Sequence, residues 1–211
     1  MLTLYYSPLA CSMASHVVLE EAGASFAAVE VNIFKGEHRR SEYLAIDPRG
    51  KVPALRFDDG RVLLETVAIL QWIGAAYPDA ALLGASALDQ ALTIATCAWL
   101  SSAVHPTFGT YVHPERFSDD EAAHAALKSR AKATFWSYLH EIDRNLADRQ
   151  WVMGSRFTVA DPYALVFYSW GLELKLPIGN LLHLTAMKER LIHRPAARRA
   201  LERENSRLLT L

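Results

Sequence analysis

Cysteine is scarce in this 211-residue sequence, which contains only Cys11 and Cys97. Two cysteines so far apart match no metal-ligand spacing and cannot form the framework of a disulfide-stapled domain. We therefore expect no bound metal, while a single disulfide between the two stays open at this point.

Long hydrophobic runs and an excess of one charge are also missing. The most apolar stretch, residues 163–172, is about half as long as the ~20 residues that a membrane span needs. The 22 basic and 23 acidic residues leave a formal charge of −1, so no positive field favours nucleic acid or an anionic membrane. The first ten residues lack the basic segment of a secretory signal. We expect a cytoplasmic protein with neither nucleic acid nor membrane as a partner.

The composition that remains, 51% hydrophobic and 21% charged, is typical of a globular protein with a proper core. Two strands are predicted over residues 2–6 and 26–32, and two further strands are predicted to begin at Pro53 and at Arg61. Helices are predicted over residues 12–22, 41–46 and 65–77. The sequence Asp58-Asp59-Gly60 predicts a hairpin turn between the last two strands. The order β-α-β-α-β-β-α indicates a small α/β domain over residues 1–80.

Residues 77–86 hold a proline, a glycine and small residues, which indicates a domain boundary. Beyond it the patterns predict only helices, over residues 87–105, 119–147, 159–172, 181–193 and 195–206. Three of these helices begin with spacings typical of a capping box, Ser86 with Asp89, Ser118 with Glu121 and Thr158 with Asp161. The second domain, residues 87–211, is therefore predicted to be all-helical.

Cys11 lies where the first predicted strand gives way to the first helix. The positive end of a helix dipole favours a thiolate, which would suit a redox nucleophile. A buried, apolar packing cysteine fits the same position equally well. Position alone leaves both interpretations open.

Two further stretches offer groups to a ligand. In residues 50–55, Pro53 lacks a backbone donor and Val52 keeps its N–H and C=O for an extended peptide, although an ordinary loop proline is the alternative. In residues 63–70, Thr66 can hold a carboxylate at a helix start and Glu65 an ammonium, although simple N-capping is the alternative. One peptide with a thiol, a free backbone and an amino-acid head would satisfy all three stretches, and glutathione has these parts in this order.

The sequence resembles the cytosolic glutathione transferases, and more narrowly their bacterial beta class, over essentially the whole chain. The resemblance rests on "YYSPLACSMASHVVLEEAG", "DPRGKVPAL", "LLETVAILQWI" and "RFTVADPYAL", which follow one another in the family's order. It implies an α/β thioredoxin-like N-terminal domain joined to an all-α C-terminal domain, a homodimer, and a glutathione site in the first domain.

The resemblance also implies roles for individual residues. Cys11 falls on the glutathione-contacting cysteine of the class, and His105 on its active-site histidine, so that His105 and Ser12 are candidate donors to the glutathione sulfur. Val52 and Pro53 fall on the peptide-pairing residues, with Pro53 cis in the family.

The two ends of glutathione are assigned in the same way. The γ-glutamyl group is expected at Glu65 and Thr66, and the glycine carboxylate at Lys35, with Lys51 or Arg40 as alternatives. A hydrophobic second substrate is expected against Phe108, Val112 and Trp170, whereas Tyr163 is expected in the core. The sequence departs from the class pattern at Pro106, where several members carry lysine, and at Ala98, where some carry asparagine.

The leading hypothesis is a detoxifying glutathione transferase that conjugates glutathione to electrophilic small molecules and exchanges disulfides through an accessible, partly activated Cys11. Because S–H is a weak hydrogen-bond donor, a cysteine in place of tyrosine or serine favours redox work. The alternatives are a non-catalytic glutathione-binding or partner-binding protein on the same fold, and a glutathione-dependent isomerase or dehalogenase.

Overall fold

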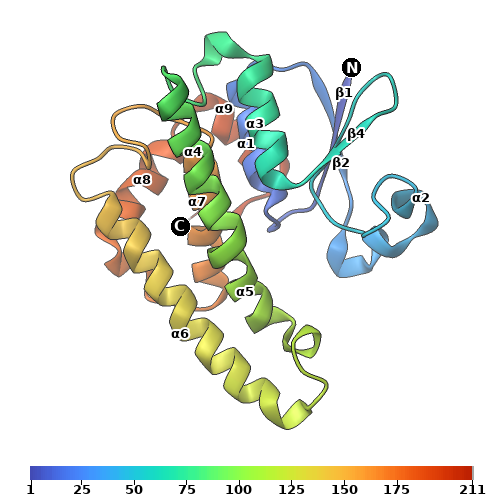
Figure 1. Ribbon diagram of the computed structural model, residues 1–211, viewed down its shortest axis with the longest axis vertical. Helices are drawn as coiled ribbons and strands as arrows, with labels where there is room; N and C mark the ends of the chain where they lie inside the picture. Colours follow the sequence, from blue (N-terminus) through green and yellow to red (C-terminus); the bar gives the residue numbers. More distant parts are fainter. Residues whose placement is uncertain (211) are drawn as a thin grey trace.

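The computed structural model describes residues 1–210, and its first part is an α/β unit on a four-stranded sheet (Figure 1). The elements are β1 (Leu2–Tyr6), α1 (Ser12–Glu21), β2 (Phe26–Glu30), α2 (Ser41–Leu44), β3 (Ala54–Arg56), β4 (Val62–Leu64) and α3 (Thr66–Ala76), with the 3-10 helices η1 (Ile33–Lys35) and η2 (Glu37–Arg39) before α2. The strand order is β2-β1-β3-β4, in which only β1 and β2 are parallel. The expected element order and hairpin are confirmed, except that β2 ends at Glu30.

Alternate residues of β1 face opposite sides of the sheet, as the pleat requires. Leu4 and Tyr6 pack into the main core with Val17 of α1. Tyr5 packs against Tyr43 in a smaller cluster on the other face. The sheet is therefore covered by α1 and α3 on one face and by the α2 segment on the other (Figure 1).

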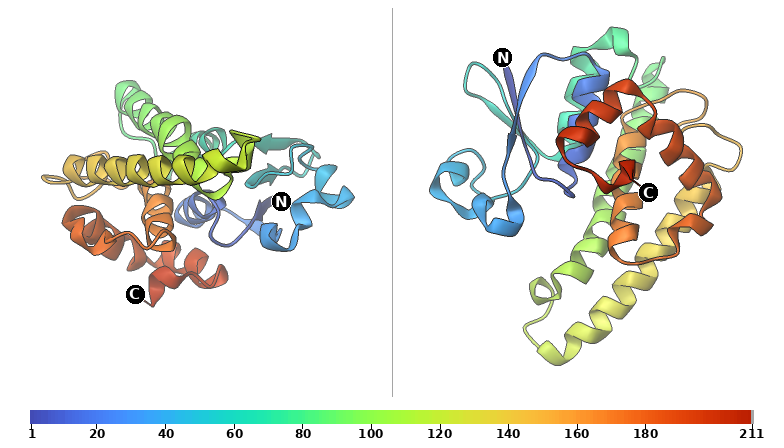
Figure 2. Two further views of the ribbon diagram at one scale, coloured as in Figure 1. Left: turned by 90° about the horizontal axis from the view of Figure 1, so that it is seen from below. Right: turned by 180° about the vertical axis from the view of Figure 1, so that it is seen from behind.

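The rest of the described chain is helical. Its helices are α4 (Ala87–Trp99), α5 (His105–Val112), α6 (Glu121–Asn145), α7 (Ala160–Glu173), α8 (Leu182–Ile192) and α9 (Pro195–Arg203), and its short turns are η3 (Pro78–Ala80), η5 (Pro114–Arg116), η6 (Ile178–Asn180) and η7 (Arg207–Leu209). Helix α7 is buried from Ala160 to Gly171 and lies between the α5–α6 layer and the C-terminal helices (Figure 2). Because α7 and α9 both contact α1, one core joins the two parts.

The expected fold class, an α/β unit followed by a helical unit, is confirmed. The boundaries at residues 80 and 87 stay predictions. Among residues 1–210, no helix combines the length and the apolar composition that crossing a membrane requires.

The helix expected over residues 87–105 continues past its expected end. A π-helical turn, Leu100–Val104, joins α4 to α5, and the N–H of His105 donates to the carbonyl oxygen of Leu100. Pro106 has no N–H to donate, and it directly follows the π-helical turn, where the hydrogen-bond spacing of the helix already changes. The proline therefore does not break the helix.

Of the predicted helix caps, the one at Ser86 is confirmed and the one at Ser118 is wrong. The Ser86 hydroxyl accepts the N–H of Asp89 at 3.1 Å and the Asp89 carboxylate accepts the N–H of Ser86 at 3.0 Å, which confirms that capping box. The expected cap at Ser118 is wrong, because Asp120 caps α6 by accepting the N–H of Ala122 at 2.9 Å. A carboxylate two residues nearer the helix takes the place of the hydroxyl.

Thr158 and Asp161 form hydrogen bonds with the backbone at the start of α7. The N–H of Thr158 donates to Asp161 Oδ2 at 2.7 Å, and the N–H of Ala160 donates to the Thr158 hydroxyl at 3.3 Å. Asp161 also accepts the N–H of Val152 at 2.7 Å. The hydroxyl of Thr158 therefore takes the N–H of Ala160 rather than that of Asp161.

Thr158→Ala is expected to lower the free energy of unfolding by about 1 kcal/mol, within a range of about 0.5–2, with little effect on ligand affinity. The substitution removes the acceptor of a buried N–H at the start of α7. Urea unfolding measures the change, and Thr110→Ala, which removes a hydroxyl from α5, is the control. An unchanged midpoint would show that Asp161 alone holds this helix start.

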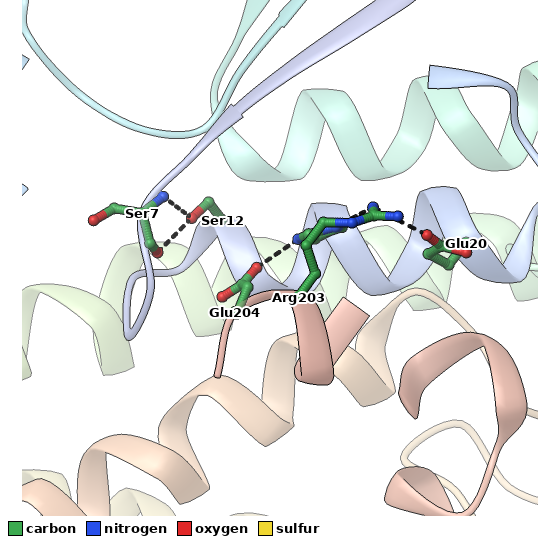
Figure 3. A network of polar contacts seen from close by, with 6 residues as sticks. Ser7, Ser12, Glu20, Arg203 and Glu204 are labelled. Atoms are coloured by element: carbon green, nitrogen blue, oxygen red, sulfur yellow. Dashed lines mark hydrogen bonds and ion pairs between the residues drawn. The ribbon is translucent and has the colours of Figure 1, made fainter. Parts of the chain in front are cut away.

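Polar side chains tie α1 to the end of α9 (Figure 3). Arg203 Nη1 donates to His16 Nε2 at 3.0 Å, so the imidazole proton lies on Nδ1, which donates to Glu204 Oε1 at 2.7 Å. Arg203 also donates to Glu20 at 3.2 Å. Burial, followed by the charge of Arg203, lowers the pKa of His16 to about 3, and burial raises the pKa of Glu204. His16 is therefore neutral in this buried contact.

Candidate active site

Cys11 lies at the N-terminal cap of α1, directly after a turn formed by residues 7–10. Its thiol donates to the carbonyl oxygen of Val52 at 3.5 Å, and the Thr66 hydroxyl donates to its sulfur at 3.6 Å. Three segments that are distant in the sequence therefore meet at one sulfur atom. The structure brings together the three stretches that were expected to share a ligand.

The Cys11 side chain is covered by its neighbours, since only 7% of the residue is exposed. Burial raises the pKa of the thiol, and the hydrogen bond from Thr66 opposes this to a smaller extent. The expectation of an accessible, partly activated thiol is therefore wrong for this structure. Desolvation beside Val52 and Thr66 outweighs the favourable end of the helix dipole.

The rate at which iodoacetamide alkylates Cys11 is expected to keep rising with pH through about pH 9, because the raised pKa leaves little thiolate near neutrality. Intact mass over a pH series gives the rate. Cys11→Ala is the blank, because Cys97 is fully buried and burial raises its pKa to about 12. A plateau below about pH 8 would instead reveal an activated thiol.

The turn that precedes Val52 is held by Asp47, which is buried. Its carboxylate accepts the N–H of Arg49 at 3.1 Å and that of Lys51 at 2.9 Å. The Tyr43 hydroxyl donates to the carbonyl oxygen of Lys51. These contacts fix the backbone on both sides of Gly50.

Val52 and Pro53 directly precede β3, and the peptide bond between them is cis, as the resemblance implied. Gly50 allows this segment to pack closely, since its φ is +60° and a β-carbon there would lie 2.6 Å from the carbonyl oxygen of His38. The backbone before Val52 therefore lies against η2, the segment that carries His38 and Arg39.

Thr66 is buried and opens α3, as expected, while Glu65 is exposed. Glu65 has a φ of +72°, a conformation that residues other than glycine seldom adopt and that is concentrated at functional sites. Its Oε1 accepts from Arg49 Nη1 at 2.8 Å. This carboxylate is accessible to a cationic group of a ligand.

His105 opens α5, and its ring centre lies 4.8 Å from that of Trp170. Burial, followed by the nearby charge of Lys51, lowers the pKa of His105 to about 4. The imidazole is therefore neutral at pH 7 and has a lone pair that can accept a hydrogen bond.

Lys51, Arg39 and Arg116, which come from three segments of the chain, lie near enough for the two arginine charges to act on Lys51, and we call the three the cationic cluster. Burial lowers the pKa of Lys51, and the charges of Arg116 and Arg39 add to this effect. The pKa of His38 is lowered by burial and then by the same three cations. Lys51 also lies close enough to the thiol to influence its pKa. The cluster is suited to a ligand carboxylate beside Cys11.

Lys35 and Arg40, the other cations expected at this carboxylate, are placed differently. Lys35 is exposed at the end of η1, and Arg40 pairs with Glu37 at 3.8 Å. Within residues 1–210, no hydrogen bond or ion pair links either cation to the three residues that meet at the sulfur. Of the three expected cations, Lys51 fits the site best, because it directly precedes Val52 and its charge acts on the Cys11 thiol.

Ser12 was expected to act on the glutathione sulfur, and its geometry contradicts that role. Its hydroxyl accepts the N–H of Ser7 at 3.1 Å and donates to the Ser7 carbonyl oxygen at 3.1 Å (Figure 3). The residue is fully buried. The Ser12 hydroxyl therefore uses both its donor and its acceptor capacity to hold the turn before Cys11.

Of the three residues expected to line a second-substrate pocket, Phe108 and Trp170 contact each other, and the pocket itself stays a prediction. Phe108 stacks on Trp170, with ring centres 4.1 Å apart and planes 15° apart, so the buried indole lies beneath Phe108. Val112, at the end of α5, is 44% exposed. Tyr163 is fully buried, which confirms its place in the core.

Four residues of the site were missed at the level of sequence: Asp47, His38, Arg39 and Arg116. Asp47 had a local signal, because an Asp-Pro pair before a glycine is typical of a turn held by the aspartate side chain. The two arginines and the histidine had no such local signal, because only the fold brings them near Lys51.

Comparison with protein families gives matches over most of the chain. Residues 10–76 match the family described as glutathione S-transferase, N-terminal domain, and residues 100–195 match glutathione S-transferase, C-terminal domain. The glutathione S-transferase GstA of Escherichia coli O157:H7 is 33% identical over 203 residues, which cover 95% of this chain and 98% of that relative.

Solved structures show the same similarity. A glutathione transferase homologue from Sulfitobacter, solved with bound glutathione, has a TM-score of 0.91 and 26% identity, covering 96% of this chain and 98% of its own. A bacterial beta-class glutathione S-transferase from Sphingomonas chungbukensis has a TM-score of 0.84 and 33% identity, with the same coverage of 96% and 98%. The resemblance seen in the sequence is thereby confirmed.

Proposed function

The chain belongs to the glutathione S-transferase family, and from this premise we propose a glutathione transferase that also exchanges disulfides through Cys11. One observation carries the proposal: the Cys11 sulfur contacts both Val52 and Thr66. These are the residues expected to hold the backbone and the γ-glutamyl end of glutathione. A tripeptide bound to both would place its own thiol next to Cys11.

Each charged end of glutathione has a complementary group in this proposal. The γ-glutamyl carboxylate binds at Thr66, where the first N–H groups of α3 favour an anion. The ammonium binds the exposed carboxylate of Glu65 in competition with Arg49. The glycine carboxylate binds the cationic cluster through Lys51.

Disulfide exchange proceeds in two balanced steps. The Cys11 thiolate attacks the glutathione sulfur of a mixed disulfide, a Cys11–glutathione bond forms, and the other thiol leaves as a thiolate that takes up a proton. A second glutathione thiolate then attacks this adduct, which releases oxidised glutathione and returns the Cys11 thiolate. Because burial raises the pKa of the Cys11 thiol, more thiolate forms at higher pH, and the first step is faster there.

In conjugation, glutathione itself is the nucleophile. Its thiolate attacks an electrophilic carbon, and the leaving group departs with the bonding electrons. His105 is neutral at pH 7, and its lone pair is available to accept a hydrogen bond from the thiol. Phe108 offers an apolar ring to a hydrophobic electrophile.

Incubation with oxidised glutathione, followed by intact-mass measurement, tests the proposal. The wild type is expected to gain one glutathione through a disulfide while one reduced glutathione is released. Cys11→Ala should gain none, and Cys97→Ala should gain one as the wild type does, because Cys97 is fully buried. A wild type that stays unmodified would remove the redox part of the proposal.

Glu65→Gln is expected to weaken glutathione binding roughly 10- to 150-fold, because a charge-assisted hydrogen bond contributes about 1.5–3 kcal/mol. Calorimetry measures the dissociation constant. Glu173→Gln is the matched control, because it breaks a comparable ion pair between Glu173 of α7 and Arg207. Equal affinity in Glu65→Gln and the wild type would place the ammonium of glutathione elsewhere.

The homodimer, the cytoplasmic location, a role in detoxification and the hydrophobic nature of the second substrate stay predictions drawn from the resemblance. The site proposed above does not depend on them.

A further inference from the structure

The turn that leads into Cys11 is strained. The N–H of Ala10 donates to the carbonyl oxygen of Ser7 at 3.1 Å, which closes a four-residue turn over Pro8 and Leu9. Leu9 has a φ of +64°, at a turn position where glycine is favoured. Such a conformation in a bulky residue persists only where the surrounding structure holds it.

Contacts from two sides hold this turn. The Ser7–Ser12 hydrogen bonds fix its base within the α/β unit (Figure 3). From α7, 161 residues further along the chain, the indole N–H of Trp170 donates to the carbonyl oxygen of Leu9 at 2.8 Å. Trp170 is 5% exposed and Leu9 is half-buried, so this hydrogen bond is partly shielded from water.

The same indole ring contacts α5. The ring centre of His105 lies 4.8 Å away, and Phe108, one turn further along α5, stacks on it at 4.1 Å. Trp170 therefore touches the backbone that carries Cys11, the histidine that opens α5, and the aromatic ring expected to meet a second substrate.

We propose that Trp170 is a positioning residue that holds the Leu9 turn so that the Cys11 sulfur stays against Val52 and Thr66. This inference rests on the proposed function for its effect on turnover. Without the indole N–H, the Leu9 carbonyl loses its partner and the turn relaxes from its positive φ. The sulfur then moves out of the arrangement from which it meets a bound glutathione.

Trp170→Phe removes the indole N–H and keeps a smaller aromatic ring, and Trp136→Phe makes the same reduction in ring size elsewhere. For disulfide exchange, kcat is expected to fall about 10- to 100-fold, as for a misplacement of about 1 Å, while the KM for glutathione stays within about twofold. The pH midpoint of Cys11 alkylation should also move downward, toward that of an exposed thiol. Trp136→Phe is the control, since Trp136 packs against His140 on α6.

A double-mutant cycle with Leu9→Gly tests the role of the turn. Glycine adopts a φ of +64° without strain, so Trp170→Phe is expected to have a smaller effect in the Leu9→Gly background than alone. Equal effects in both backgrounds, or a Trp170→Phe variant with wild-type kcat and alkylation midpoint, would overturn the proposal. Trp170 would then be only a core residue.

If Trp170→Phe does not fold, a measurement on the wild type still tests the proposal. With indole N–H signals assigned from the other Trp→Phe variants, alkylation of Cys11 is expected to shift the Trp170 signal and leave that of Trp136 unchanged. An unchanged Trp170 signal contradicts the positioning role. Because alkylation needs no glutathione chemistry, this outcome is distinct from failure of the proposed function, which would show as a wild type without a glutathione adduct.

Discussion

Cys11→Ala is expected to lower kcat for glutathione-dependent disulfide reduction at least about 100-fold, and conjugation of glutathione to an aryl halide by less than about tenfold. The two activities separate because Cys11 forms and breaks a covalent bond only in disulfide exchange. In conjugation the attacking sulfur belongs to glutathione, and Cys11 contributes at most one weak S–H donor.

Cys11→Ser sharpens this test. A hydroxyl is a better hydrogen-bond donor than a thiol, so this variant is expected to keep or increase conjugation while losing disulfide reduction like Cys11→Ala. Both activities are measured on the same preparations, with a mixed disulfide of glutathione in one assay and the aryl halide in the other. Cys97→Ala controls for the second cysteine, which is fully buried in α4.

Two results would contradict this account. Full disulfide reduction by Cys11→Ala would return Cys11 to the role of a small packing residue. An equal loss of both activities in Cys11→Ser would show that the sulfur supports the glutathione site as a whole and has no separate redox step.

The fold was predictable from local patterns in the sequence. The hairpin at Asp58–Gly60 and the capping box at Ser86 depend on residues within four positions of each other, so their chemistry is visible in the chain. Ser118 shows the limit of such patterns, because Asp120, two residues further along the chain, offered a second acceptor and took the cap. The π-helical turn before His105 was not predicted, because a proline next to it is equally compatible with a helix end.

The candidate site was predictable in its members and less so in its electrostatics. Cys11, Val52 and Thr66 were chosen separately, and the structure joins them. The raised pKa of Cys11 was not predictable, because it depends on burial by residues far along the chain. Trp170 was expected to face a substrate, and only the fold shows its indole N–H on the carbonyl of Leu9.

His16→Leu is expected to destabilise the protein by about 1–3 kcal/mol, the largest stability change anticipated for a single substitution here. The imidazole is completely buried, and its Nδ1–H is the donor to Glu204 Oε1. Leucine fills a similar volume but leaves the buried carboxyl group of Glu204 without that donor, while the Arg203 guanidinium loses one acceptor and keeps Glu20. A buried polar group that loses its partner bears the full cost of desolvation.

The double substitution His16→Leu with Glu204→Leu separates loss of the contact from loss of packing. Replacing a buried polar pair by apolar residues is often close to neutral, so the double variant is expected to regain most of the stability lost in His16→Leu. Urea unfolding at one fixed protein concentration measures all variants. The control is Arg198→Ala, which removes an exposed pair with Glu202 in α9 and should cost less than about 1 kcal/mol. If the double variant is no more stable than His16→Leu, the imidazole acts through its packing against Tyr6 and Phe26 and not through its hydrogen bond to Glu204.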